Sequence, residues 1–209
     1  DERHGAVDPW FIELAARMTA CLDRLGFPYC RGGVMATSPL WRKTLPQWRH
    51  QLALWMKARV ETMLLGCDIF FDFRCVYGEC SLADTLRAHV TEAAARNRGF
   101  LLEMYGIQAD HRAGIGLFGR LRTERTNPAH RGELNLKLQG TLPLAEGVRL
   151  MALAAGVTAL GTQARIDALA AAGLIGTHDA DHLRSAFAFL TGLQLRRQID
   201  DYRAGRPVS

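Results

Sequence analysis

Apolar positions in the first part of the chain recur every three or four residues, which predicts an amphipathic helix. The pattern begins after Asp8 and Pro9, a pair typical of a helix N-terminus, and it ends at Gly26. A short apolar stretch over 29–36 follows, interrupted by two adjacent glycines. This stretch predicts a short strand with an irregular backbone.

Helical periodicity returns over 46–66 and dominates the second half of the chain. The segment 67–77 is strongly apolar with embedded charges; its pattern does not decide between a strand and a buried helix, and we favour a helix. Ser81 is the expected cap of the helix that follows it. The further helices are predicted over 82–96, 100–109, 142–155, 161–172 and 179–204.

Two short segments alternate between apolar and polar residues with a period of two, which is typical of strands. They cover 117–123 and 134–138, and a turn-rich stretch separates them. We therefore expect a β-hairpin with a long loop. The predicted fold is mainly α, a helical bundle that carries this one hairpin.

The composition is that of a globular protein. The chain has 209 residues, of which 48% are hydrophobic and 22% charged. It has neither an apolar run of about 18 residues nor the features of a signal peptide, so we expect a cytoplasmic protein without a membrane span. Its 5 cysteines are an odd number in a chain that is large enough to fold without disulfides. We expect buried thiols and no disulfide framework.

The formal net charge of +5 is carried mostly by arginine, whose guanidinium group suits phosphate and carboxylate ligands. The basic residues are dispersed among 21 acidic ones and form no basic tail or stripe. A nucleic-acid partner is therefore not expected.

Two motifs in the sequence match known binding patterns but lack the required context. Residues 114–119 match G-x-G-x-x-G, yet a predicted helix precedes them and strand-like residues follow, so a flexible entry to the hairpin is the better interpretation. His178 and His182 flank a D-x-D motif that could hold a metal ion. Acidic residues are also typical of a helix N-terminus, so we favour a helix start over a metal site here. No grouping suggests nucleophilic catalysis, and we expect neither catalytic residues nor metal ligands in this chain.

Asp72 and Arg74 are charges inside an apolar segment, where burial is costly unless a charge is paired. A structural ion pair and a ligand-facing pair both remain open. Further cations are Arg120, Arg122, Arg125 and Lys137 on the predicted hairpin and Arg196 and Arg197 on the last helix. For these a solvated face is the default interpretation, and a binding role is the alternative.

Several stretches together resemble a known family. They are residues 25–41, 69–78, 117–120 and 136–140. They resemble the nucleotidyltransferases of bacterial signal-transduction proteins, which often carry cyclic-nucleotide-binding and CBS domains and are distant relatives of PII uridylyltransferase.

The resemblance implies two domains. Residues 1–60 are expected to be an N-terminal αβ remnant of a polymerase-β-like nucleotidyltransferase domain, and 61–209 a helical substrate-binding domain. The Gly-Ser turn and the D-x-D carboxylates that hold Mg²⁺ in such enzymes are expected upstream of Asp1. We therefore expect the parent protein to be the enzyme and this chain alone to be inactive.

The expected function is to help bind a nucleoside triphosphate and an unknown acceptor, which can be a protein; the alternative is a non-catalytic ligand-sensing or protein-interaction module. A homodimer is left open. The candidate binding residues, several of them implied by the resemblance, are Arg31, Gly32, Gly33, Asp72, Arg74, Tyr77, Arg120, Lys137, Arg196 and Arg197.

Overall fold

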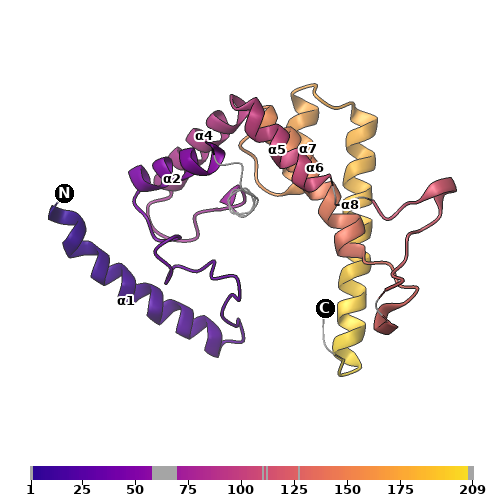
Figure 1. The fold of residues 1–209 in the computed structure, drawn as a ribbon, viewed down its shortest axis with the longest axis horizontal. Coiled ribbons are helices and arrows are strands. Elements are labelled where there is room, and N and C mark those ends of the chain that lie inside the picture. Colours follow the sequence, from indigo (N-terminus) through magenta and orange to yellow (C-terminus); the bar gives the residue numbers. More distant parts are fainter. Residues whose placement is uncertain (1, 58–69, 110, 112, 127, 207–209) are drawn as a thin grey trace. The chain divides into compact units, whose positions relative to one another are not determined.

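The computed structural model describes residues 2–57, 70–109, 111, 113–126 and 128–206 (Figure 1). The chain divides into two compact units, residues 1–51 and 52–209. Within the described residues, no helix is long and apolar enough to cross a lipid bilayer.

The first unit consists of a long helix and an irregular segment fastened to it. Helix α1 spans Glu2–Arg24, so it begins earlier than expected and contains Pro9 in its interior. Arg42 holds the irregular segment, because its guanidinium contacts Asp8 Oδ1 at 3.0 Å and donates to the carbonyl oxygen of Ala36 at 3.0 Å. Helix α2, Leu45–Lys57, follows.

The strand predicted over 29–36 is wrong, and with it the αβ remnant. Successive turns occupy this range: Gly33 N donates to Cys30 O at 3.0 Å, and Met35 N to Gly33 O at 2.9 Å. Gly33 has a φ of +67°, a conformation that favours glycine and ends an extended segment. The described residues provide no neighbouring strand to pair with this range.

The second unit is built from helices close to the predicted ones. Helix α4 begins one residue before Ser81, and Glu79 rather than Ser81 is its N-cap, accepting a hydrogen bond from the backbone N–H of Ser81. The helices are α4 (Cys80–Ala95), α5 (Arg98–Gln108), α6 (Leu142–Ala154), α7 (Thr162–Ala171) and α8 (Thr177–Arg203).

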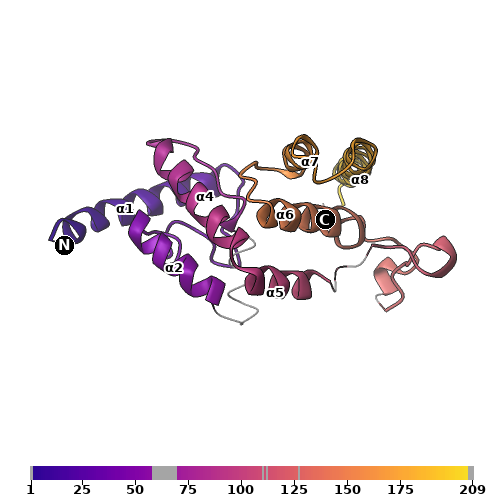
Figure 2. The same ribbon diagram turned by 90° about the horizontal axis from the view of Figure 1, so that it is seen from above.

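Helix α6 is central to the core of this unit. It packs against α4, α5 and α7, and α8 packs on α7. Figure 2 shows α6 between α5 on one side and α7 and α8 on the other. The innermost side chains come from the inward faces of three helices and are Val148, Ala152, Ile166, Leu169 and Ala180.

The predicted β-hairpin is wrong as well. Only an isolated antiparallel bridge joins Ile115 to Leu121, and residues 117–119 form a 3₁₀ turn. The second predicted strand lies partly in a π-helical turn, η3 (Lys137–Thr141), that runs directly into α6. Three leucines at every second position imitated a strand in a segment too short for its period to be decisive.

Two expectations for the segment before α4 also need correction. Residues 71–77 form turns and irregular backbone, not a helix, while 67–69 lie outside the described residues. Cys75 and Cys80 form a disulfide with Cα atoms 5.4 Å apart, and the thiols of Cys21 and Cys30 are exposed. The expectation of unpaired thiols is therefore wrong for Cys75 and Cys80 and confirmed for Cys21 and Cys30, whereas the expectation that the thiols of Cys21 and Cys30 are buried is wrong.

Candidate functional site

A tight turn over 114–122 projects from the helices of the second unit (Figures 1 and 2). Gly116 N donates to Arg120 O at 2.7 Å, and Arg122 N donates to Gly114 O at 2.8 Å. At its tip, Phe118 has a φ of +61°, which is uncommon for a residue with a side chain, and it is 96% exposed. The backbone thus holds an aromatic ring in solvent.

The turn is fastened to η3 at the entry to α6. Gly114 N donates to Gln139 O at 2.8 Å. A Cβ at Gly114 would lie 2.9 Å from Leu134 Cδ1 and 3.1 Å from Gln139 Cβ, so a larger residue would require these two side chains to shift. The first glycine of this motif therefore serves a close contact between backbone segments.

An open cavity of about 520 Å³ lies between this turn and η3. Three arginines line it, together with one glutamate. Among the described residues, no acidic side chain pairs with these three guanidinium groups. The lining residues are Gly116, Arg120, Leu121, Arg122, Thr123, Glu124, Arg125 and Gln139.

Two other lining residues, Glu124 and Gln139, carry hydrogen-bond acceptors. Glu124 is turned to its own chain, since its Oε1 accepts from Arg125 N at 2.8 Å and Thr126 N at 2.6 Å. Gln139 Oε1 is buried and has no hydrogen-bond partner among the described residues. The cavity therefore presents three positive charges, one negative charge whose Oε1 already accepts backbone N–H groups, and one acceptor that lacks a donor.

A second group of charges surrounds Asp72. Its carboxylate contacts Arg149 Nη2 on α6 at 2.5 Å and Arg165 Nη2 on α7 at 2.7 Å. The Arg165 side chain is 5% exposed and also donates to the carbonyl oxygen of Phe71 at 3.3 Å. Asp72 thus joins two helices to the segment that precedes α4.

A third arginine, which lies on α4, holds the same segment. Arg87 Nη2 donates to Phe73 O at 2.7 Å, and its guanidinium lies 4.6 Å from the centre of the Phe73 ring. These contacts immobilise residues 71–73. The partners of Asp72 are arginines far along the chain and not Arg74, whose side chain is exposed.

The predicted binding residues do not gather at one place. Arg31, Gly32 and Gly33 are exposed in the first unit. In the second unit, Arg74 and Tyr77 are exposed beside Asp72, and Arg120 lines the cavity. Their roles in binding stay predictions.

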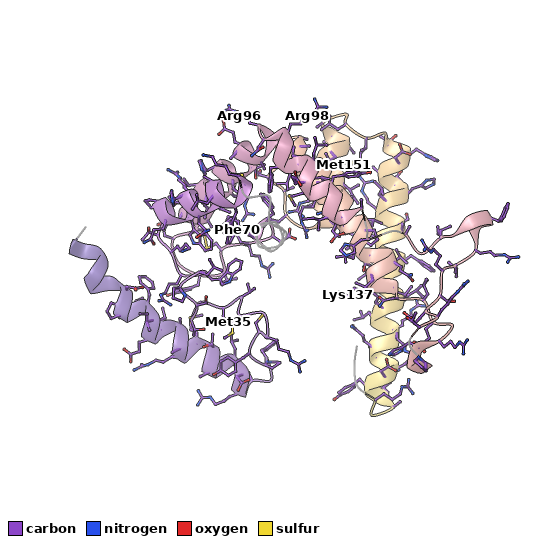
Figure 3. All side chains as sticks on the ribbon, viewed as in Figure 1. Met35, Phe70, Arg96, Arg98, Lys137 and Met151 are labelled. Carbon is purple, nitrogen blue, oxygen red and sulfur yellow. A yellow bond between two sulfur atoms is a disulfide. The ribbon has the colours of Figure 1, made fainter. Side chains whose placement is uncertain are left out.

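The remaining predicted cations lie on η3 and α8. Lys137 is exposed on the first turn of η3 (Figure 3), and Arg196 is exposed on α8. Arg197 contacts Asp201 Oδ2 at 3.2 Å and Glu133 Oε1 at 3.8 Å. Arg206 also binds Asp201, and this hydrogen bond is the main cause that lowers the pKa of the Asp201 carboxyl.

Sequence reasoning singled out Asp72 and the arginines of the cavity, but it missed Arg149, Arg165 and Gln139. Arg149 and Arg165 follow apolar helical residues, the same signal that drew attention to Asp72, and a search for isolated charges would have found them. Gln139 carries no such signal, because its role depends on the π-helical turn.

The charged groups were also compared with the requirements of a metal ion. Among the described residues, no group of three or more His, Cys, Asp or Glu side chains could hold one. The described residues therefore do not form a site that fits Mg²⁺.

Two family descriptions match the chain. Residues 98–209 match "putative nucleotidyltransferase substrate binding domain", and residues 1–62 match "putative nucleotidyltransferase DUF294". No curated protein and no solved structure matches the chain. The substrate-binding match covers more than half of the chain and contains the whole arginine-lined cavity. The chain therefore belongs to the nucleotidyltransferase family that these two descriptions define.

Proposed function

We propose that this chain binds the polyanionic substrate of a nucleotidyltransferase, foremost the triphosphate of a nucleotide, in the cavity lined by Arg120, Arg122 and Arg125. The observation that carries the proposal is that three arginines without an acidic partner among the described residues line one cavity within a substrate-binding domain. An acidic acceptor, which can be a protein, is the second ligand that this charge would accept.

The charge of the cavity suits phosphate better than a neutral ligand. A guanidinium fork donates two parallel hydrogen bonds to phosphate or carboxylate oxygens, and such charge-assisted bonds are stronger than neutral ones. Glu124 is the only acid among the lining residues, and backbone N–H groups already bind its carboxylate. The positive charge of the lining is therefore available to a ligand.

The buried amide oxygen favours a ligand that has donors as well as phosphates. Gln139 Oε1 needs an N–H or O–H partner, and a nucleotide supplies both kinds through its base and its ribose. Lys137, exposed two positions earlier on η3, is proposed to contribute to the same positive field. Arg31, Gly32, Gly33, Arg74, Tyr77 and Arg196 remain proposed ligand contacts of the complete enzyme.

Calorimetric titration of the 209-residue chain tests this function. ATP, UTP, GTP, CTP and inorganic tripolyphosphate are titrated at low and at moderate salt, without added acceptor. We expect the triphosphates to bind, with an affinity that falls as salt rises, because the contacts are ionic. If tripolyphosphate and all four nucleotides fail to bind at low salt, the proposed function is wrong. Binding of an acidic acceptor alone would support the second ligand over the first.

A further inference from the structure

The disulfide between Cys75 and Cys80 closes an exposed loop that connects two well-anchored parts of the second unit. We call residues 74–79 the clasp loop. On one side, Arg87 and Arg165 hold the carbonyl oxygens of Phe73 and Phe71. On the other side α4 begins at Cys80.

Little besides the disulfide orders the clasp loop. Among the described residues, 74–78 form no hydrogen bond or ion pair with another element; the Cys75 sulfur contacts only Tyr77 O, inside the loop. Tyr77 is 96% exposed, and Gly78 has a φ of +92°. Opening the disulfide would therefore release this loop while residues 71–73 and α4 keep their own contacts.

The disulfide is placed poorly for stabilising the fold. A cross-link stabilises less when the chain that it closes is shorter, and this one closes only four residues. A chain of 209 residues with a helical core does not need such a link to fold. A control role explains its position better.

The bond is also within reach of small thiols. Cys80 is exposed and Cys75 is half-buried. Cys80 is the first residue of α4, where the helix N-terminus favours the thiolate, the form that reacts in thiol–disulfide exchange. Exposed disulfides are the ones that small thiols reduce readily.

We propose that Cys75 and Cys80 form a reversible thiol–disulfide modification site, with low-molecular-weight disulfides and thiols of the glutathione class as its reagents, and that this site controls the order of the clasp loop. The Cys80 thiolate attacks glutathione disulfide and releases one glutathione thiolate. The Cys75 thiolate then attacks the mixed disulfide at the Cys80 sulfur and releases the second. The protein loses two electrons and two protons, and one glutathione disulfide becomes two glutathione thiols.

The test begins with a variant in which Cys21→Ser, Cys30→Ser and Cys67→Ser leave only the pair. It is equilibrated with mixtures of reduced and oxidised glutathione, alkylated with iodoacetamide and weighed by mass spectrometry. We expect two alkylated thiols in reduced glutathione and none in excess oxidised glutathione, with full recovery on reversal. Retention of both free thiols in excess oxidised glutathione would overturn the proposal.

Limited trypsin digestion then measures the order of the loop. Cleavage after Arg74 is expected to be about fivefold or more faster in the reduced protein, because proteolysis follows local opening. Cleavage after Arg131, in a distant exposed turn, is the internal control and should not change. The Cys75→Ser/Cys80→Ser variant should be cleaved at the fast rate in both buffers.

Equal cleavage after Arg74 in the two states would contradict a control role, and so would a parallel change after Arg131, which indicates general unfolding. Should the three-serine variant not fold, the same digestion of the unaltered chain, with peptide mapping of Cys75 and Cys80, gives the same decision. None of these measurements requires a nucleotide, so the proposed function and this site can fail separately.

Discussion

At the scale of single residues, Asp72 is the charge in an apolar segment that the sequence singled out. Its charge is compensated by Arg149 and Arg165, of which the second is almost fully buried. An isolated charge in an apolar segment was a valid signal, but the sequence could not name the partners. They lie on helices 77 and 93 positions away (149 − 72 and 165 − 72), and only the packing of α6 and α7 brings them to Asp72.

Replacing Asp72 by Asn should destabilise the protein by about 1–3 kcal/mol, because two largely buried guanidinium groups lose their carboxylate. The estimate is below that of a fully buried pair since the Asp72 side chain is 41% exposed. Arg74→Ala is the matched control and should change the free energy of unfolding by less than about 0.5 kcal/mol. Urea unfolding measures both; an equal loss in the two variants would contradict the ion-pair network described here.

Asp201 should make the stability of α8 depend on pH. The hydrogen bond from Arg206 lowers the pKa of Asp201 in the folded protein below its unfolded value, against the opposing effect of burial. Its stabilising contribution is therefore fully present above the unfolded pKa, and it is lost as the pH falls through the lower folded pKa.

Carboxyl NMR titration checks this prediction. Arg206→Ala should raise the pKa of Asp201 toward its ordinary value, and Asp201→Asn should lower the melting temperature at pH 7 but much less in strong acid. Arg203→Ala, on the same last turn, is the control for a simple loss of charge. An Asp201 pKa that is the same with and without Arg206 would show that the ion pair does not form in solution.

At the scale of elements, packing decides which apolar residues matter. Ile166 on α7 is 0% exposed, whereas Leu195 on α8 is 56% exposed. Ile166→Ala should cost about 2–5 kcal/mol through lost burial and a cavity, and Leu195→Ala less than about 0.5 kcal/mol. Similar midpoints of urea unfolding for the two variants would mean that α7 does not pack into the core as found.

The helices were predictable from the sequence, and the irregular segments were not. Helices α5 to α8 repeat their apolar pattern over several turns, so their ends were placed within a few residues. The predicted strands rested on stretches of five to eight residues, where turns or a π-helical turn can show the same pattern. The cavity could not be predicted for the same reason, because irregular segments form it. Arg120 was among the predicted residues, but its place beside Gln139 follows from the way η3 packs against the turn.

At the scale of the whole molecule, the family matches cover residues 1–62 and 98–209, and the Asp72 segment lies between them. The predicted domain boundary near residue 60 stays a prediction. In the structure, the boundary between the two compact units lies between residues 51 and 52. The proposed function therefore rests on the substrate-binding match together with the cavity that it contains.

The 209-residue chain should not transfer nucleotides by itself. The described residues provide no group of carboxylates that fits a metal ion, which the nucleotidyl transfer of the expected enzyme requires. Labelled ATP, UTP, GTP and CTP are incubated with the chain, Mg²⁺ and candidate acceptors. Label transfer that depends on both Mg²⁺ and the chain would contradict this expectation.

The most direct test of the account compares nucleotide binding by two variants that lose the same charge. Arg120→Ala/Arg122→Ala removes two lining residues of the cavity, and Arg96→Ala/Arg98→Ala removes two exposed arginines at the α4–α5 junction (Figure 3). Calorimetric titration with the best-binding triphosphate should give an affinity lower by about 10- to 100-fold for the cavity variant, and one within about twofold of the unaltered chain for the control. Equal affinities of the two variants would contradict the assignment of the cavity as the substrate site.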